Sequence, residues 1–181
     1  MHTPFHFQVV HQSTRSKARV CRIHTPHGII ETPAFVPVGT HATIKALDPL
    51  LVKTVHTQIM FCNTYHLMLH PGVSIIAQAG GLHQFMNWHL PLITDSGGFQ
   101  IFSLKYHSVQ EELKSKGQKK QTNSVINISE EGVLFRSYRD GSSIMMTPEL
   151  SIQAQKSLGA DIIIPLDELP GYYTHYDQLC T

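Results

Sequence analysis

Short apolar runs alternate with polar, glycine-rich or proline-rich stretches along most of the chain. Near the N-terminus, three runs at residues 5–10, 19–23 and 28–32 have the β-branched and aromatic content that is typical of short strands. A stretch with one proline and one glycine, residues 24–28, separates the last two runs and is typical of a tight turn. The pattern predicts a small antiparallel β layer that makes up an N-terminal domain at residues 1–33.

Four further apolar runs follow, at residues 34–38, 58–62, 90–94 and 161–166. Stretches with helical features separate them, and polar residues or glycines come directly after each run. Buried strands that alternate with helices indicate βα units and a parallel sheet. The sequence therefore predicts an α/β fold, in which the carboxyl edge of the sheet is the place where chemistry is found.

Two helix starts are marked by a capping residue followed by proline. Asp48 precedes Pro49, and Thr147 precedes Pro148 and an apolar-periodic segment that ends at a glycine. An Asp or Thr side chain at the N-cap accepts a backbone N–H, and proline is favoured in the first helical position. We therefore expect helices to begin at both places.

Composition and charge argue against several classes of protein. The chain has 181 residues, of which 41% are hydrophobic and 15% charged, and its formal net charge is +1. Bulk charge does not indicate a basic nucleic-acid module, and no apolar run approaches the ~18 residues of a membrane span. Three widely spaced cysteines without a CxxC motif fit a reducing compartment. We expect a cytoplasmic protein without a membrane partner.

A polar segment near residues 105–127 interrupts the alternation and contains four lysines, at positions 114, 116, 119 and 120. Charged insertions between elements are usually solvated, and we favour that interpretation. The alternative is that the lysines contact the phosphates of a nucleic acid.

Carboxylates follow two of the predicted strands. Asp95 ends one strand, and Asp167 with Glu168 ends another. Such groups serve as acids, bases or nucleophiles. An ionised carboxylate has acceptors only, so it also fits the two adjacent donors of guanine, N1–H and the 2-amino group. The alternative is that both aspartates cap the helices that follow them.

The first carboxylate belongs to a denser motif, DSGGFQ at residues 95–100. The adjacent Gly97 and Gly98 allow a close backbone approach and expose N–H groups, and Phe99 can stack on a planar ring. Neither GxGxxG nor GxxxxGK is present, so a phosphate loop is not indicated. The motif suits a flat, hydrogen-bonding heterocycle.

Two other patterns are weaker evidence for a functional site. Cys62, His66 and His70 have a spacing that places three zinc-ligand types on one face of a helix. No fourth ligand is evident, and the segment includes a strand end, so a metal site is the minor interpretation. Residues 130–142, with an Asp-Gly pair, predict a structural β-hairpin.

Taken together, these motifs resemble the tRNA-guanine transglycosylases, also called queuine tRNA-ribosyltransferases, of the bacterial type. The DSGGFQ and NTYHL motifs carry most of the resemblance. The matching stretches run through most of the chain in the family's order, at residues 31–40, 62–67, 71–72, 80–88, 91–104, 130–142, 147–163 and 166–170.

The resemblance implies that residues 34–181 are the first half of a (β/α)8 barrel, preceded by the antiparallel layer. It implies a pentosyltransferase that exchanges guanine at the wobble position of tRNA for a 7-deazaguanine in queuosine modification. An aspartate attacks the ribose C1′ in glycoside-type chemistry, and the base leaves its stack to react. Asp95 would be the catalytic acid/base and would also contact the base, supported by a hydrogen bond from Asn63.

The remaining base contacts are implied in the same way. Ser96, Gly97 and Gly98 would line the base pocket, and Phe99 would stack on the base. Asp167 would accept from the Watson–Crick edge of guanine. The expected partners are tRNA and a guanine or 7-deazaguanine base, and the complete enzyme is expected to be a homodimer.

The sequence departs from the family pattern in three ways. The insertion near residues 105–127 is longer than in most bacterial members of the family. Leu169 stands where a cysteine is common. The chain ends at Thr181, and the family's nucleophilic aspartate and zinc site, a CxCxxC cluster with a distant histidine, are expected in the second half of the barrel. We therefore expect zinc in the complete enzyme but no metal ligands in this chain. Catalysis by the chain alone stays open, and the alternatives are a non-catalytic half that binds guanine or tRNA, a decayed fragment, or an unrelated small α/β metal protein.

Overall fold

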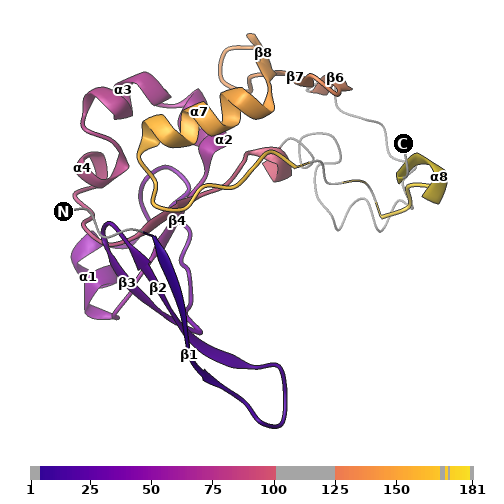
Figure 1. The fold of residues 1–181 in the computed structure, drawn as a ribbon. Helices are drawn as coiled ribbons and strands as arrows, with labels where there is room; N and C mark the ends of the chain where they lie inside the picture. Colours follow the sequence, from indigo (N-terminus) through magenta and orange to yellow (C-terminus); the bar gives the residue numbers. More distant parts are fainter. Residues whose placement is uncertain (1–4, 101–124, 168–169, 171, 180–181) are drawn as a thin grey trace. The chain divides into compact units, whose positions relative to one another are not determined.

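The computed structural model describes residues 5–100, 125–167, 170 and 172–179 (Figure 1). The chain divides into two compact units. The first unit comprises Met1–Asp95 and Ala154–Ile164, and the second comprises Ser96–Gln153 and Pro165–Thr181. These bounds differ from the domain boundary expected after residue 33, and that boundary stays a prediction.

The predicted N-terminal antiparallel layer is confirmed. Strands β1 (His6–Gln12), β2 (Arg19–Thr25) and β3 (Gly28–Thr32) form one antiparallel sheet in that order. Cys21 and Ile30 are its buried residues of hydrophobic type, whereas every residue of β1 is exposed. The sheet therefore buries one face of its second and third strands.

The parallel arrangement of the four apolar runs is also confirmed. Strand β4 (Met60–Cys62) pairs in parallel with β5 (Leu92–Thr94). Single parallel bridges add one residue on each side, Val38 to Phe61 and Ile162 to Ile93. The carboxyl ends of the four runs therefore point the same way.

The two outer runs were expected to be buried strands, and this expectation is wrong. Within the described residues they pair with the sheet only at the bridges, and Phe35 is 85% exposed. Both runs contain a proline, Pro37 and Pro165, which has no N–H to donate to a ladder. They also lie at the two edges of the described sheet, so one side of each run is not covered by a neighbouring strand.

Short helices surround the parallel strands of the first unit. They are α1 (Pro49–Thr54), α2 (Thr64–Leu69), α3 (Val73–Gln78) and α4 (Leu82–Met86). The predicted cap of α1 is present, because the N–H of Leu50 donates to Asp48 Oδ1 over 2.8 Å. The buried core consists of Ala42, Val52, Met60, Cys62, Leu67, Ile76, Leu82, Trp88, Leu92 and Leu158.

The second predicted helix start is confirmed as well. Helix α7 (Pro148–Leu158) begins after Thr147, whose Oγ1 accepts the N–H of Leu150 over 3.1 Å. It ends before Gly159, which has a φ of +74°. A residue in this left-handed region is the usual end of a helix, and glycine adopts it without steric cost.

The second unit contains a three-stranded antiparallel sheet. Its strands β6 (Val125–Ser129), β7 (Gly132–Arg136) and β8 (Ser143–Met146) pair in chain order, and a short helix, α8 (Tyr176–Leu179), follows later. The predicted hairpin is present between β7 and β8, with the Asp-Gly pair in its turn.

The expected lysine-rich insertion falls mostly outside the described residues, which begin again at residue 125. Its last three positions, 125–127, belong to strand β6 and not to a polar insertion. Val125, Ile126 and Ile128 explain this outcome, because β-branched residues favour a strand, and this strand pairs with β7.

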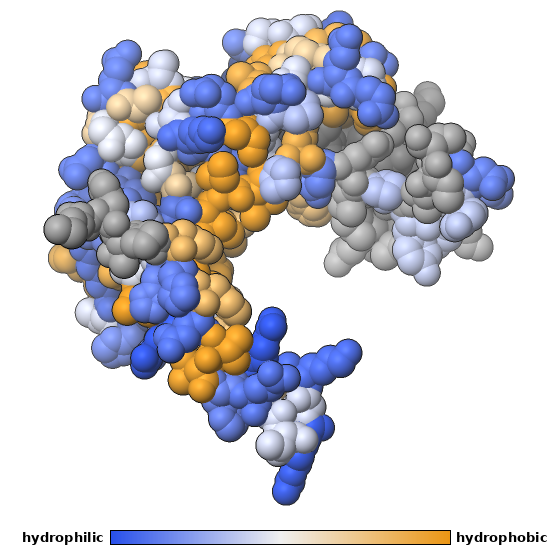
Figure 2. Space-filling model, in the orientation of Figure 1, coloured by the Kyte–Doolittle hydropathy of each residue, from blue (hydrophilic) through white to orange (hydrophobic). Residues whose placement is uncertain are grey.

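Hydrophobic residues also reach the molecular surface. Figure 2 shows them among hydrophilic residues on the visible face. In the first unit, the most exposed large ones include Phe35, Leu50 and Val55. Among the described helices, none has the length and apolar character needed to cross a bilayer.

Candidate functional site: aspartates after parallel strands

Asp95 directly follows the last residue of β5. Its carboxylate is held by residues that come directly after the neighbouring parallel strand, β4. Its Oδ2 accepts a hydrogen bond from Asn63 Nδ2, and its Oδ1 accepts the backbone N–H of Thr64, both over 2.7 Å. Asn63 and Thr64 come directly after β4. The pairing of β4 with β5 therefore places all three residues at one edge of the sheet.

The expected hydrogen bond between Asn63 and Asp95 is thus present. The alternative role of Asp95, as the cap of the helix that follows it, is not what the structure shows. The N–H that its carboxylate accepts belongs to the first residue of α2, a helix from an earlier part of the chain. The local helix begins at Gly98, whose N–H donates to Ser96 Oγ over 3.1 Å.

Thr64 is a contact that sequence reasoning missed. Its hydroxyl donates to the backbone carbonyl of Asp95 over 2.6 Å, in addition to the bond from its N–H. Thr64 is completely buried, although it lies beside a polar motif. Its position immediately after Asn63 in the NTYHL motif was the available signal, because a β-branched hydroxyl residue at a helix start often bonds to the backbone.

The surroundings of Asp95 keep two other titratable groups uncharged. Burial, with a smaller contribution from the charge of Asp95, raises the pKa of the Cys62 thiol to about 12. Burial and the nearby His41 lower the pKa of His66, and Asp95 opposes this shift. At neutral pH the Cys62 thiol is therefore protonated and the His66 imidazole is neutral.

Asp167 has its own partners in the second unit. Its Oδ1 accepts the hydroxyl of Ser96 over 2.7 Å, and the hydroxyl of Ser151 donates to the backbone carbonyl of Ser96 over 2.8 Å. Asp167 is exposed, and among the described residues its second oxygen has no hydrogen-bond donor. The carboxylate is therefore oriented and keeps free acceptor capacity. Glu168, its sequence neighbour, lies outside the described residues.

The two glycines of the motif are required for different reasons. Gly97 has a φ of +87°, a conformation that other residues rarely adopt. A Cβ on Gly98 would collide with the backbone oxygen of Asp167 and lie 2.8 Å from its Oδ1. Gly98 thus allows the approach of Asp167 itself, whereas the sequence argument had considered only the approach of a ligand. Phe99 is 53% exposed and offers a ring face to solvent.

The Cys62, His66 and His70 pattern does not form a metal cluster. Among the described residues, the potential metal ligands that lie close together in a group of three are His27, His83 and Asp161 instead. Cys62 lies in a strand and not on the helix of His66, so the helical spacing assumed from sequence does not apply. The Cys62 Sγ instead lies 3.8 Å from Met86 Sδ in the core.

The zinc site implied by the resemblance does not fit the residues present. It needs a CxCxxC cluster, and the three cysteines of the sequence stand at positions 21, 62 and 180. The two that the structure describes, Cys21 and Cys62, are buried with free thiols on separate sheets. No step of the chemistry below is assigned to that ion.

The fold and the aspartate sites define a class: a mixed α/β protein in which parallel strands present carboxylates at their carboxyl ends. The family follows from comparison with known proteins. The family model described as queuine tRNA-ribosyltransferase matches residues 13–180, and the chain belongs to this family.

Curated relatives agree with that assignment. The queuine tRNA-ribosyltransferase of Protochlamydia amoebophila is 63% identical over 98% of this chain and 46% of its own length. Those of Chlamydia abortus and Chlamydia pneumoniae are 58% and 55% identical over 93% and 97% of the chain. The chain therefore spans about half the length of the curated relatives it matches.

Proposed function

We propose that this chain supplies the base-binding part of a tRNA-guanine transglycosylase, which replaces guanine at the wobble position of tRNA with a 7-deazaguanine. Family membership supports the reaction class, a pentosyl transfer. The observation that carries the proposal is the carboxylate of Asp95, fixed through both oxygens at the carboxyl edge of parallel strands. The fold proposed for the complete enzyme is the (β/α)8 barrel, of which these parallel strands are the first.

Asp95 is proposed as the acid/base and as a contact to the base. Exchange of one base for another at a ribose C1′ requires a proton for the departing ring and its removal from the arriving one. Each carboxylate oxygen has two lone pairs and uses one to accept a hydrogen bond, Oδ2 from Asn63 and Oδ1 from Thr64. The remaining lone pairs are available to a substrate, and the two bonds keep the carboxylate from rotating away.

Asp167 is proposed to recognise the Watson–Crick edge of the base. Guanine and 7-deazaguanines present two neighbouring donors there, and a carboxylate accepts both. The bond from Ser96 orients one oxygen and leaves the other open. Ser96, Gly97 and Gly98 are proposed to line the base pocket. Phe99, which is half exposed, is proposed to stack on the flipped base.

The proposed setting is that of an enzyme that acts on tRNA. The partners are tRNA and the incoming base, the compartment is the cytoplasm, and the complete enzyme is a homodimer with a zinc site outside the described residues of this chain. The relatives support this setting through their name, queuine tRNA-ribosyltransferase.

The test separates base binding from exchange, because the chain covers about half of its relatives. Equilibrium dialysis with labelled guanine measures binding to the chain, and incorporation of the label into tRNA measures exchange. We expect binding by the wild-type chain and a loss of about 10-fold to 100-fold in Asp167→Asn, since one amide oxygen cannot accept from both donors. Asp48→Asn, which changes an exposed helix cap, is the matched control and should bind as the wild type does.

The alternative function is a half that binds guanine or tRNA without turnover. Its basis is that the chain spans about half the length of its relatives, and the same pair of assays decides between the two. Binding that depends on Asp167 together with no incorporation assigns the chain to this alternative. Unchanged guanine affinity in Asp167→Asn would remove that residue from the site.

A further inference from the structure

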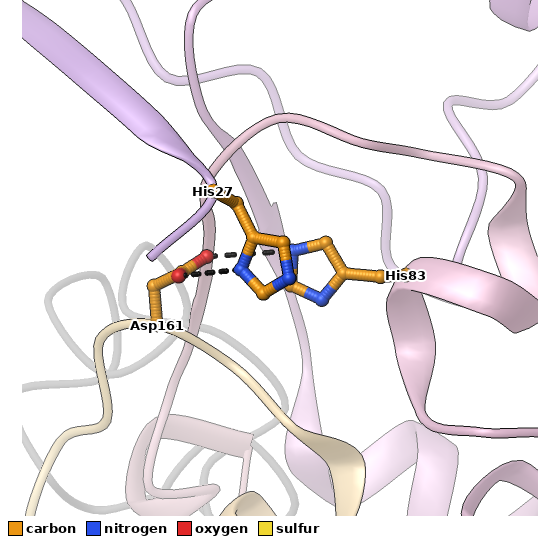
Figure 3. Close-up of side chains that lie close together, drawn as sticks. All are labelled: His27, His83 and Asp161. Atoms are coloured by element: carbon orange, nitrogen blue, oxygen red, sulfur yellow. Dashed lines mark hydrogen bonds and ion pairs between the residues drawn. The ribbon is translucent and has the colours of Figure 1, made fainter. Parts of the chain in front are cut away.

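A second cluster of functional groups lies in the first unit, apart from the DSGGFQ motif. Figure 3 shows His27 and His83 with their rings face to face and Asp161 beside both. His27 Nδ1 lies 2.7 Å from Asp161 Oδ1, and His83 Nε2 lies 3.4 Å from Oδ2. The ring centroids are 3.5 Å apart. Two imidazoles thus converge on one carboxylate.

We propose that His27, His83 and Asp161 bind a single divalent transition-metal ion, with Zn²⁺ as the fitting probe. Two imidazole nitrogens and one carboxylate oxygen are a donor set that Zn²⁺ accepts. One potential ligand atom from each residue lies within 4.8 Å of the others. Around a tetrahedral zinc ion, neighbouring ligand atoms are about 3.3 Å apart for metal–ligand bonds of about 2.0–2.1 Å. The rings are stacked with an interplanar angle of 15°, so at least one imidazole must turn before both nitrogens can point at one ion.

The ring nitrogens that would bind the ion are the ones that now face the carboxylate. His27 Nδ1 lies within hydrogen-bond distance of Asp161 Oδ1, and a carboxylate can only accept, so the imidazole is the donor of this contact. A histidine binds a metal through an unprotonated nitrogen, so the ion would take the place of the proton in this contact, and that proton would be released.

Burial and access also suit a bound ion. The side chain of Asp161 is completely buried, and His83 is nearly so, whereas His27 is 39% exposed in the turn between β2 and β3. The backbone N–H of Leu92 donates to Asp161 Oδ2 over 2.9 Å and orients the carboxylate. The carbonyl oxygen of Leu90 lies 3.2 Å from His83 Nε2, within hydrogen-bond distance of the same nitrogen. Solvent reaches the cluster on the side of His27.

The place of the cluster in the fold makes its role structural. Asp161 binds Leu92 at the start of β5, whereas Asp95 follows the end of the same strand. The ion would therefore lie at the opposite end of the strand from the proposed reaction. It would join three distant parts of the sequence, the β2–β3 turn, helix α4 and the segment after α7. Such a cross-link stabilises the folded state by binding it alone.

Metal binding is tested on the chain after treatment with a chelator. Isothermal titration with ZnCl₂ measures affinity and stoichiometry, and the visible spectrum of bound Co²⁺ reports the ligand set and geometry. We expect one Zn²⁺ per chain and a higher melting temperature in its presence. His27→Ala should weaken binding about 100-fold or more and abolish the thermal shift.

The matched control is His89→Ala, which removes an exposed histidine of the same unit and should bind zinc as the wild type does. Asp161→Asn is the second variant and should also lose the Co²⁺ spectrum. Circular dichroism checks that His27→Ala, at an exposed turn, keeps its fold. Absence of zinc binding in the wild type overturns the proposal. So does full binding in His27→Ala, which would assign the ion to other histidines.

Discussion

A buried glutamine on α7 provides a quantitative test of how this fold is held together. Gln155 is completely buried, and three of its hydrogen bonds join separate parts of the chain. Its Oε1 accepts the hydroxyl of Thr94 over 3.0 Å and the N–H of Ile164 over 2.9 Å. Its Nε2 donates to the carbonyl of Ile164 over 2.7 Å. The side chain therefore joins α7 to β5 and to the last apolar run of the first unit.

The substitution Gln155→Leu keeps the size of the side chain and removes all three bonds. Each bond contributes about 1 kcal/mol, and a buried donor left without a partner costs about 1–3 kcal/mol. Ile164 is partly exposed, so its backbone groups can bind water, but the Thr94 hydroxyl is completely buried. We expect a loss of about 3 kcal/mol in the free energy of unfolding.

Urea denaturation followed by fluorescence measures this loss. The chain has one tryptophan, Trp88, which is buried in the core of the first unit and reports on the unit that contains Gln155. With a slope of about 2 kcal/mol per molar urea, the midpoint should fall by about 1.5 M. Lys156→Gln, an exposed position on the same helix, is the control and should change stability by less than about 0.5 kcal/mol. Equal midpoints for Gln155→Leu and the wild type would refute the reasoning.

Three further outcomes are expected. The Cys62 thiol, with a pKa raised to about 12 by burial, should resist alkylation at pH 8 in the native chain and react fully in urea, as peptide mass spectrometry will show. Gly98→Ala should lower both the urea midpoint and guanine binding, because its Cβ would collide with the backbone of Asp167; equal values for both would contradict the proposed packing. Hydrogen bonds, chiefly from Ser137 and Ser142, lower the pKa of Asp140 below its ordinary value. The contribution of Asp140 to folding stability is therefore present above its pKa in the unfolded chain and is lost as the pH falls through its pKa in the folded chain. An NMR titration of the Asp140 carboxyl measures the folded-state pKa, and an ordinary value would contradict this prediction.

The sequence patterns predicted the structure correctly where it depends on residues that are close together in the chain. The caps at Asp48 and Thr147 act on N–H groups within three residues, and both helices begin where the sequence predicts. The antiparallel layer follows from strand-forming runs joined by a short turn. The order of the parallel strands follows from the alternation of runs and helices, since crossover connections lead to parallel neighbours.

The same patterns failed where the decision depends on distant partners. The outer runs were expected to be buried because they are apolar, but burial depends on what covers them, and Phe35 is exposed. The spacing of Cys62, His66 and His70 suited one helix face, but the chain changes from strand to helix between the first two residues. In the candidate site, the resemblance predicted the bond from Asn63 to Asp95, but the two bonds from Thr64 were not expected, and they depend on the pairing of β4 with β5.

By itself, the sequence determined the family, the helix starts at Pro49 and Pro148, and the parallel arrangement of the apolar runs. Each of these depends on residue type and on spacing within a few positions. Only the tertiary structure decided that Thr64 holds Asp95, that Gln155 is buried, and that His27 and Asp161, 134 residues apart, meet at one point. The physical reason is that a hydrogen bond or a metal ligand set depends on positions in space to within a few tenths of an ångström. No local pattern of residues encodes the distance between segments that chain packing brings together.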